Sequence, residues 1–81
     1  MASTDFYLRP ETLSTFYVDA LKRDGHTKLV GWRSAPLRTQ RAGSPQGVDV
    51  LTAEGRILRV GTGLGGRVEA EDITAMERAG A

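Results

Sequence analysis

The sequence has no cysteine and only one histidine, His26, among its 81 residues. A disulfide framework and a thiolate metal site are therefore excluded, and a lone imidazole cannot build a zinc site. No apolar run approaches the roughly 20 residues needed to cross a bilayer, so we expect no membrane contact. The first residues lack the basic start and apolar core of a secretion signal. This absence favours a cytoplasmic protein.

Recognisable catalytic arrangements are also scarce. No nucleophile is marked near His26, which a general base would need. Residues 61–66 match the spacing GxGxxG, but the 15 residues that follow cannot complete a dinucleotide-binding unit. Four acids near the end are expected on a helix whose dipole they would stabilise: Glu69, Glu71, Asp72 and Glu77. We therefore predict a non-enzymatic protein with no cofactor and no metal.

Charge is distributed unevenly along the chain. Residues 28–67 carry a net charge of +5, whereas the preceding 27 residues carry −1 and the last 14 carry −3. A basic middle region favours a surface that binds an anionic partner. The candidate partner-binding residues are its basic side chains and the one tryptophan: Lys28, Trp32, Arg33, Arg38, Arg41, Arg56, Arg59 and Arg67.

Residues 10–23 are expected to form a helix, because apolar side chains recur there at i, i+3, i+4, i+7 and i+8. Pro10 suits the first helical position, and Gly25 can close the helix in the left-handed conformation. Alternating apolar residues also allow a strand, which would give a mostly-β, SH3-like barrel instead. The helical face consists of Leu13, Phe16, Tyr17, Ala20 and Leu21.

A sheet is expected to follow. Residues 28–34 form a strand in which Gly31 marks a bulge or a close backbone approach. Residues 35–46 form a long loop, and 48–52 and 56–60 pair as a hairpin whose loop places Gly55 in the left-handed conformation. This register sets Val48 against Val60, Val50 against Leu58, Asp49 against Arg59, and Leu51 against Ile57.

The chain is predicted to end in a helix over 69–78, with Ile73 and Met76 facing inward. The fold class is α+β: one small domain over 10–81, with a three-stranded antiparallel sheet, an N-terminal helix and a short C-terminal helix. Residues 1–9 precede it as a tail or short edge strand.

The predicted α-β-β-β-α order resembles that of the double-stranded RNA-binding domain over roughly residues 10–79. That family reads RNA largely through lysines at the start of its second helix. The corresponding segment here, residues 67–71, reads RVEAE. The resemblance therefore implies an element order and does not imply RNA recognition.

Three functions fit this sequence. The first is an interaction or regulatory protein whose arginine-rich sheet-and-loop face binds an acidic partner protein. The second is an RNA- or DNA-binding module that uses the same arginines, with Trp32 as a stacking platform unless that side chain is part of the core. The third is a subunit of a homo-oligomer or larger assembly that pairs through open sheet edges.

Overall fold

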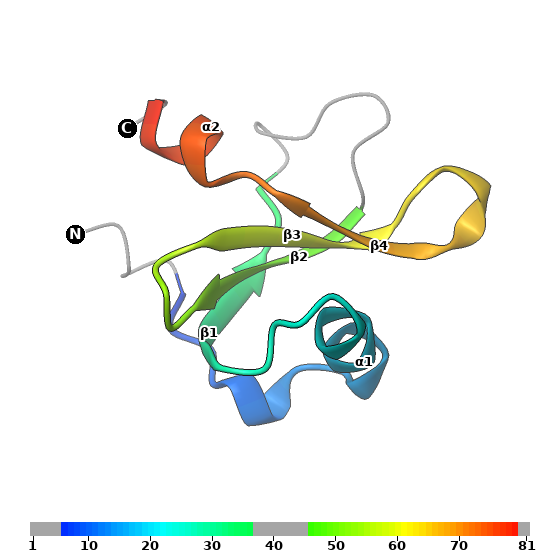
Figure 1. Cartoon of the computed structure of the whole chain (residues 1–81), viewed down its shortest axis with the longest axis horizontal. Helices are drawn as coiled ribbons and strands as arrows, with labels where there is room; N and C mark the ends of the chain where they lie inside the picture. The colour runs from blue at the N-terminus through cyan, green and yellow to red at the C-terminus, as the bar shows by residue number, and fades with distance from the viewer. Residues whose placement is uncertain (1–5, 37–45, 80–81) are drawn as a thin grey trace.

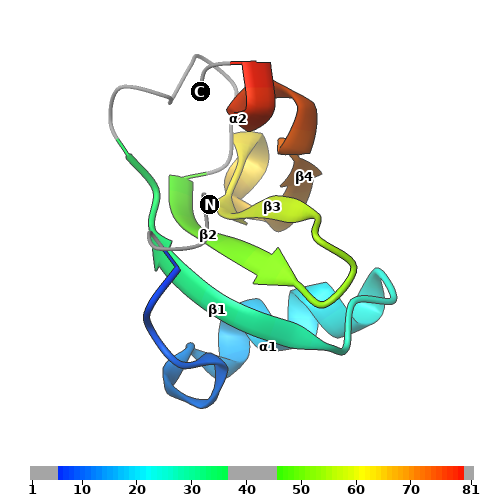
Figure 2. The ribbon, with the colours of Figure 1, turned by 90° about the vertical axis from the view of Figure 1, so that its left-hand side faces the viewer.

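A computed structural model of the chain describes residues 6–36 and 46–79. One antiparallel sheet contains four strands in chain order, β1 (Leu29–Ser34), β2 (Gln46–Thr52), β3 (Ile57–Thr62) and β4 (Val68–Asp72). Two helices, α1 (Thr15–Arg23) and α2 (Thr74–Ala79), lie on opposite sides of it (Figure 1, Figure 2). Two 3-10 turns, η2 (Pro10–Thr12) and η4 (Leu64–Gly66), are also present. The α+β class is confirmed, but the sheet has one strand more than predicted.

Helix α1 begins five residues later than the sequence predicted. Ser14 is its N-cap, and the Ser14 hydroxyl accepts a hydrogen bond of 3.2 Å from the backbone N–H of Phe16. Such a cap satisfies a donor that the first turn leaves without a helical partner. Pro10 opens η2 instead, and extended backbone at Leu13 separates this turn from the helix.

The end of α1 agrees with the prediction. Gly25 has a φ of +89°, and its N–H donates to the carbonyl of Lys22 over 3.0 Å. The N–H of His26 donates to the carbonyl of Leu21 over 2.8 Å. This pair of bonds terminates a helix through a left-handed residue. The helical interpretation is confirmed over 15–23, so the barrel that required a strand there is not the fold.

The β2–β3 hairpin is confirmed residue by residue. Each of the four expected pairs is present in the sheet. Gly55 closes the connecting turn with a φ of +83°, where its N–H donates to the carbonyl of Thr52. This register was predictable because a shift of one residue would have placed apolar and charged side chains on the same face of the hairpin.

A short N-terminal strap, residues 6–8, lies along the outer edge of β1. Leu8 and Trp32 exchange two backbone hydrogen bonds of 3.3 and 3.0 Å. The register of β1 shifts between Leu29 and Gly31, and a Cβ atom at Gly31 would overlap the carbonyl oxygen of Phe6. Gly31 therefore marks both a bulge and a close backbone approach, as the sequence predicted.

The predicted C-terminal helix over 69–78 is wrong in its first half. Residues 68–72 form β4, and only Thr74–Ala79 are helical. The side chains of Val68 and Ala70 pack against the core beneath α1, and this burial outweighs the helix propensity of the intervening glutamates. The carboxylate of Asp72 accepts bonds from the N–H and the hydroxyl of Thr74, which fixes the start of α2.

The sheet is covered on both faces. The larger core lies under α1 and consists of Leu13, Ala20, Leu21, Val48, Val50, Leu58 and Val60. A smaller cluster on the other face contains Phe6, Ile57 and Ile73, with Leu51 and Met76 packed against it. Phe16 was expected in the core but is 63% exposed, because Tyr17, Ala20 and Leu21 define the inward side of α1. Within the described residues, neither helix is long and apolar enough to cross a membrane.

Candidate interaction edge and the buried charge ladder

One row of charged residues crosses the whole sheet. Arg33 on β1 pairs with Asp49 on β2, Asp49 pairs with Arg59 on β3, and Arg59 pairs with Glu71 on β4. Cross-strand partners place their side chains on the same face of a sheet. The row therefore alternates in sign from one edge to the other, and we call these four residues the charge ladder.

The centre of the ladder is buried. Asp49 and Arg59 have no exposed surface, and Arg33 is 6% exposed. One oxygen of Asp49 accepts from Arg59 Nε at 2.7 Å, and the other accepts from Arg59 Nη2 at 3.1 Å. That second oxygen also accepts from Arg33 Nε and Nη2 at 3.0 and 2.9 Å. A buried carboxylate is tolerable here because several charge-assisted hydrogen bonds replace its hydration.

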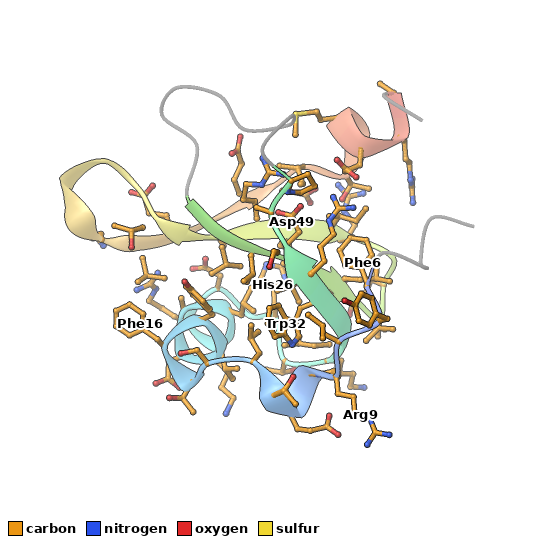
Figure 3. All side chains as sticks on the ribbon, turned by 180° about the vertical axis from the view of Figure 1, so that it is seen from behind. Phe6, Arg9, Phe16, His26, Trp32 and Asp49 are labelled. Carbon is orange, nitrogen blue, oxygen red and sulfur yellow. The ribbon has the colours of Figure 1, made fainter. Side chains whose placement is uncertain are left out.

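Two elements cover the β1 end of the ladder. Glu77 on α2 accepts a bond of 2.8 Å from Arg33 Nη2, and the ring of Phe6 lies 4.6 Å from the Cζ atom of Arg33. Figure 3 shows Phe6 and Asp49 on this side of the sheet. Burial alone would lower the pKa of Arg33, but its hydrogen bonds to Glu77 and Asp49 outweigh burial and raise that pKa. The guanidinium stays charged.

Two of the predicted partner-binding residues are therefore inside the molecule. Arg33 and Arg59 are buried and ion-paired, so they cannot form part of an exposed basic face. Charge content along the sequence does not distinguish an exposed arginine from a buried one. The predicted pairing of Asp49 with Arg59 was the one available sign that these charges neutralise each other.

The three remaining basic candidates that the structure describes lie at opposite ends of the sheet. Lys28 and Arg56 lie near the β2–β3 turn, where the carbonyl of Lys28 accepts from the N–H of Ala53. Arg67 lies at the opposite end of β3, in the loop that leads into β4. All three are exposed, and Arg56 Nη2 is 2.9 Å from an oxygen of Asp72. Arg38 and Arg41 lie outside the described residues.

Trp32 is half-buried against the core beneath α1. Its indole N–H is shared between the carbonyl of Arg9 and the hydroxyl of Thr12, each 3.0 Å away. Figure 3 shows Trp32 beside the η2 turn, where these acceptors lie. Trp32 thus joins η2 to the sheet, a structural role that the sequence left open.

The outer edge of β4 is the feature that the sequence did not reveal. The N–H of Gly63 donates to the carbonyl of Arg67, and the N–H of Ile73 donates to the carbonyl of Ile57. Hydrogen-bonded pairs alternate along antiparallel strands, so Val68, Ala70 and Asp72 direct their backbone groups away from β3. In the described part of the chain, β4 ends the sheet and no further strand pairs with it.

The two faces of this edge differ: Glu69 and Glu71 lie on one face, and Val68 and Ala70, followed by Asp72, lie on the other. Glu69 and Asp72 are exposed, and Glu71 is partly buried. Hydrogen bonds from the Thr74 hydroxyl and N–H, with help from Arg56, lower the pKa of Asp72 to about 2. Val68 and Ala70 alternate with Glu69 and Glu71 and face the α1 side, whereas Asp72 continues the row of Val68 and Ala70 at the end of the strand. Period-two alternation over 68–71 was the signal that could have identified the strand.

Helix α1 contributes two groups near this edge. Nη2 of Arg23 donates to the carbonyl of Val68 over 3.0 Å, so one outward backbone acceptor of β4 is occupied by a side chain. Figure 3 shows Phe16 projecting from α1 on the same side as the loop that leads into β4. This exposed ring lies 6.3 Å from that of Tyr17, which is partly buried against the core.

Within residues 6–36 and 46–79, no group of three His, Asp or Glu side chains is placed to hold a metal ion. Comparisons with protein-family models, with curated proteins and with solved structures give no match to this chain.

Proposed function

We propose that this protein is a non-enzymatic interaction module that binds an extended segment of a partner protein along the outer edge of β4. The observation that carries this proposal is the asymmetry of the sheet. The strap pairs with β1 at Leu8, whereas β4 directs the backbone groups of three residues outward. An added strand would complete the outward hydrogen bonds that remain beside the Val68 carbonyl, which Arg23 occupies, and several peptide-binding domains capture extended ligands in this way.

The edge is also sterically suited to an added strand. Ala70, at its middle, has a small side chain that packs inward against the core. The sheet row behind it is fixed by the buried hydrogen bonds of Asp49, so β3 offers β4 a rigid support. A preformed edge binds with little ordering cost on its own side.

The test uses peptides selected for binding from a displayed random library, with the protein labelled for NMR. We expect selected peptides to slow hydrogen exchange at the outward amides of Val68, Ala70 and Asp72. Ala70→Pro should abolish this binding, because proline removes an outward N–H without breaking a bond to β3. Ala70→Ser, which keeps that N–H, is the matched control. Peptides that bind Ala70→Pro as well as the wild type would overturn the proposal.

Binding of an acidic partner protein or of nucleic acid through basic side chains remains a second proposal. It is supported by the exposure of Lys28 and Arg56 at one end of the sheet. It is weakened by the burial of Arg33 and Arg59. Titration with single- and double-stranded nucleic acid at about 50 and 200 mM salt tests it, since phosphate contacts weaken steeply with salt. Glutamine at both exposed positions should remove the salt-dependent binding.

Self-assembly through the same edge is the third possibility and fits least well. Two copies of β4 paired antiparallel about Ala70 would set Glu69 opposite Glu71 twice. Like charges directly opposite each other destabilise a strand pair. Light scattering at high protein concentration should therefore show a monomer.

A further inference from the structure

We infer that the segment bound at β4 carries two basic side chains, two residues apart, which stand opposite Glu69 and Glu71, with an apolar residue between them. This inference rests on the proposed binding edge and adds the chemistry of the partner. The observation behind it is the charge ladder, whose sign alternates across β1, β2, β3 and β4 and ends in a carboxylate at the open edge.

A fifth strand would continue the row. The three existing steps of the ladder each set opposite charges side by side. A residue placed next to Glu71 would therefore meet its best electrostatic complement as Lys or Arg. Glu69 lies two residues away on the same face and is exposed. A second cation on the partner strand, opposite Glu69, would therefore be favoured as well.

The backbone pattern of β4 sets the spacing between partner and glutamates. Because Val68, Ala70 and Asp72 direct their backbone groups outward, they take the bonded positions opposite an antiparallel added strand, where Val68 offers its N–H and its carbonyl is occupied by Arg23. Glu69 and Glu71 then occupy the non-bonded pairs, where Cα atoms are about 4.5 Å apart and side chains are closest. The two cations of the partner thus lie in direct reach of the two carboxylates.

The residue between the cations faces the other side of the sheet. There it meets Ala70, whose neighbours are the partly buried Val68 and the core beneath α1. Phe16, exposed on α1, adds apolar surface on this side of the molecule. An aliphatic or aromatic side chain at that position would bury apolar area that a polar one would not.

Synthetic peptides provide the probe. The first peptide has the central sequence Thr-Lys-Val-Lys-Thr. The second has the same composition but places the two lysines next to each other. The third has glutamate in place of both lysines of the first. At low salt we expect only the first to protect the Ala70 amide strongly. Each lost charge pair should weaken binding about two- to fivefold, as cross-strand pairs do.

Charge reversal on the protein sharpens the test. Glu69→Lys should weaken binding of the lysine peptide and strengthen binding of the glutamate peptide, whereas Glu54→Lys, in the β2–β3 turn, should change neither. Both sites are exposed, so both variants are expected to fold.

Equal binding of the alternating and adjacent lysine peptides would overturn the inferred pattern. If the lysine and glutamate peptides protect Ala70 equally, the edge still binds and only the charge inference fails. If the designed peptides fail to protect β4 while library-selected peptides protect it, only this inference fails; if neither set protects β4, the proposed function fails.

Discussion

At the scale of single residues, Asp49 is the most demanding position in the protein. Its carboxylate has no exposed surface and accepts four hydrogen bonds from two arginines. Desolvating such charges is costly, and the cost is repaid only while every partner is present. The ladder therefore specifies how the strands align more than it adds net stability.

Replacing Asp49 by asparagine should lower the free energy of unfolding by about 3–5 kcal/mol, because Arg33 and Arg59 would both lose the buried carboxylate between them, and Arg33 would keep only Glu77. Urea denaturation followed by circular dichroism measures this change. Glu54→Gln removes the same charge from an exposed turn and should stay within about 0.5 kcal/mol of the wild type.

An apolar replacement of the same group gives the complementary result. With Arg33→Met, Asp49→Leu and Arg59→Met combined, stability should equal or exceed that of the wild type. A triple variant as unstable as Asp49→Asn would show that the charges themselves hold the strands together.

Asp72 should make the protein sensitive to acid. Its pKa falls from 3.8 to about 2 in the folded state, through Thr74 first and Arg56 second. The stabilisation is therefore complete above about pH 4 and is lost as pH falls towards 2. Asp72→Asn should flatten the dependence of unfolding free energy on pH across that interval. Asp19→Asn, at an exposed site on α1, is the control, and an unchanged slope in Asp72→Asn would contradict the assignment.

At the scale of elements, the strap is held through a position that has no room for a side chain. Gly31 lies under the backbone of Phe6, which in turn places its ring over Arg33. Phe6 thus connects the bulge at Gly31 to Arg33 of the charge ladder. A substitution at Gly31 should therefore also disturb the packing around Arg33 in the charge ladder.

Gly31→Ala should destabilise the fold by about 1–3 kcal/mol, as overpacking does. It should also speed hydrogen exchange at Leu8 and Trp32, whose mutual bonds hold the strap. Ser34→Ala, at an exposed site on the same strand, serves as the comparison and should leave both rates unchanged. Faster exchange spread evenly over the whole sheet would argue against a local role.

The elements differ in how far the sequence predicted them. The β2–β3 hairpin was predictable because Gly55 and two alternating faces agreed on one register. β4 was not, because glutamate and alanine favour helix in isolation and only pairing with β3 decides otherwise. The late start of α1 depends on a local Ser14 cap that competed with Pro10.

The candidate site was less predictable from the sequence than the fold. An open edge depends on strand order, and the burial of Arg59 depends on which face receives α2. Both are properties of the assembled sheet, so the local amino-acid composition does not predict them.

At the scale of the whole molecule, stability should be unevenly shared. The central strands β2 and β3 lie between the two cores, whereas β4 is supported from one side in the described structure. Folding also moves two positive charges and one negative charge inside, so the surface is less basic than the sequence suggests. The first effect makes the β4 side the accessible part of the sheet.

Hydrogen exchange should show an alternating pattern along β4. The amides of Glu69 and Glu71 face β3 and should be protected, while that of Ala70 should exchange far faster although it lies in the same strand. NMR-detected exchange in the unbound protein measures this. Uniform protection of the three amides would mean that the outer edge is already covered.

The ladder also constrains how such a sequence can diverge. Replacing any one of Arg33, Asp49 or Arg59 removes at least one partner from a buried charge, so single substitutions in this set are expected to lower stability and, with it, fitness. Descendants can leave the set only by changing several positions within a short interval. We therefore expect relatives of this chain to keep all three residues or to have exchanged them together for apolar ones.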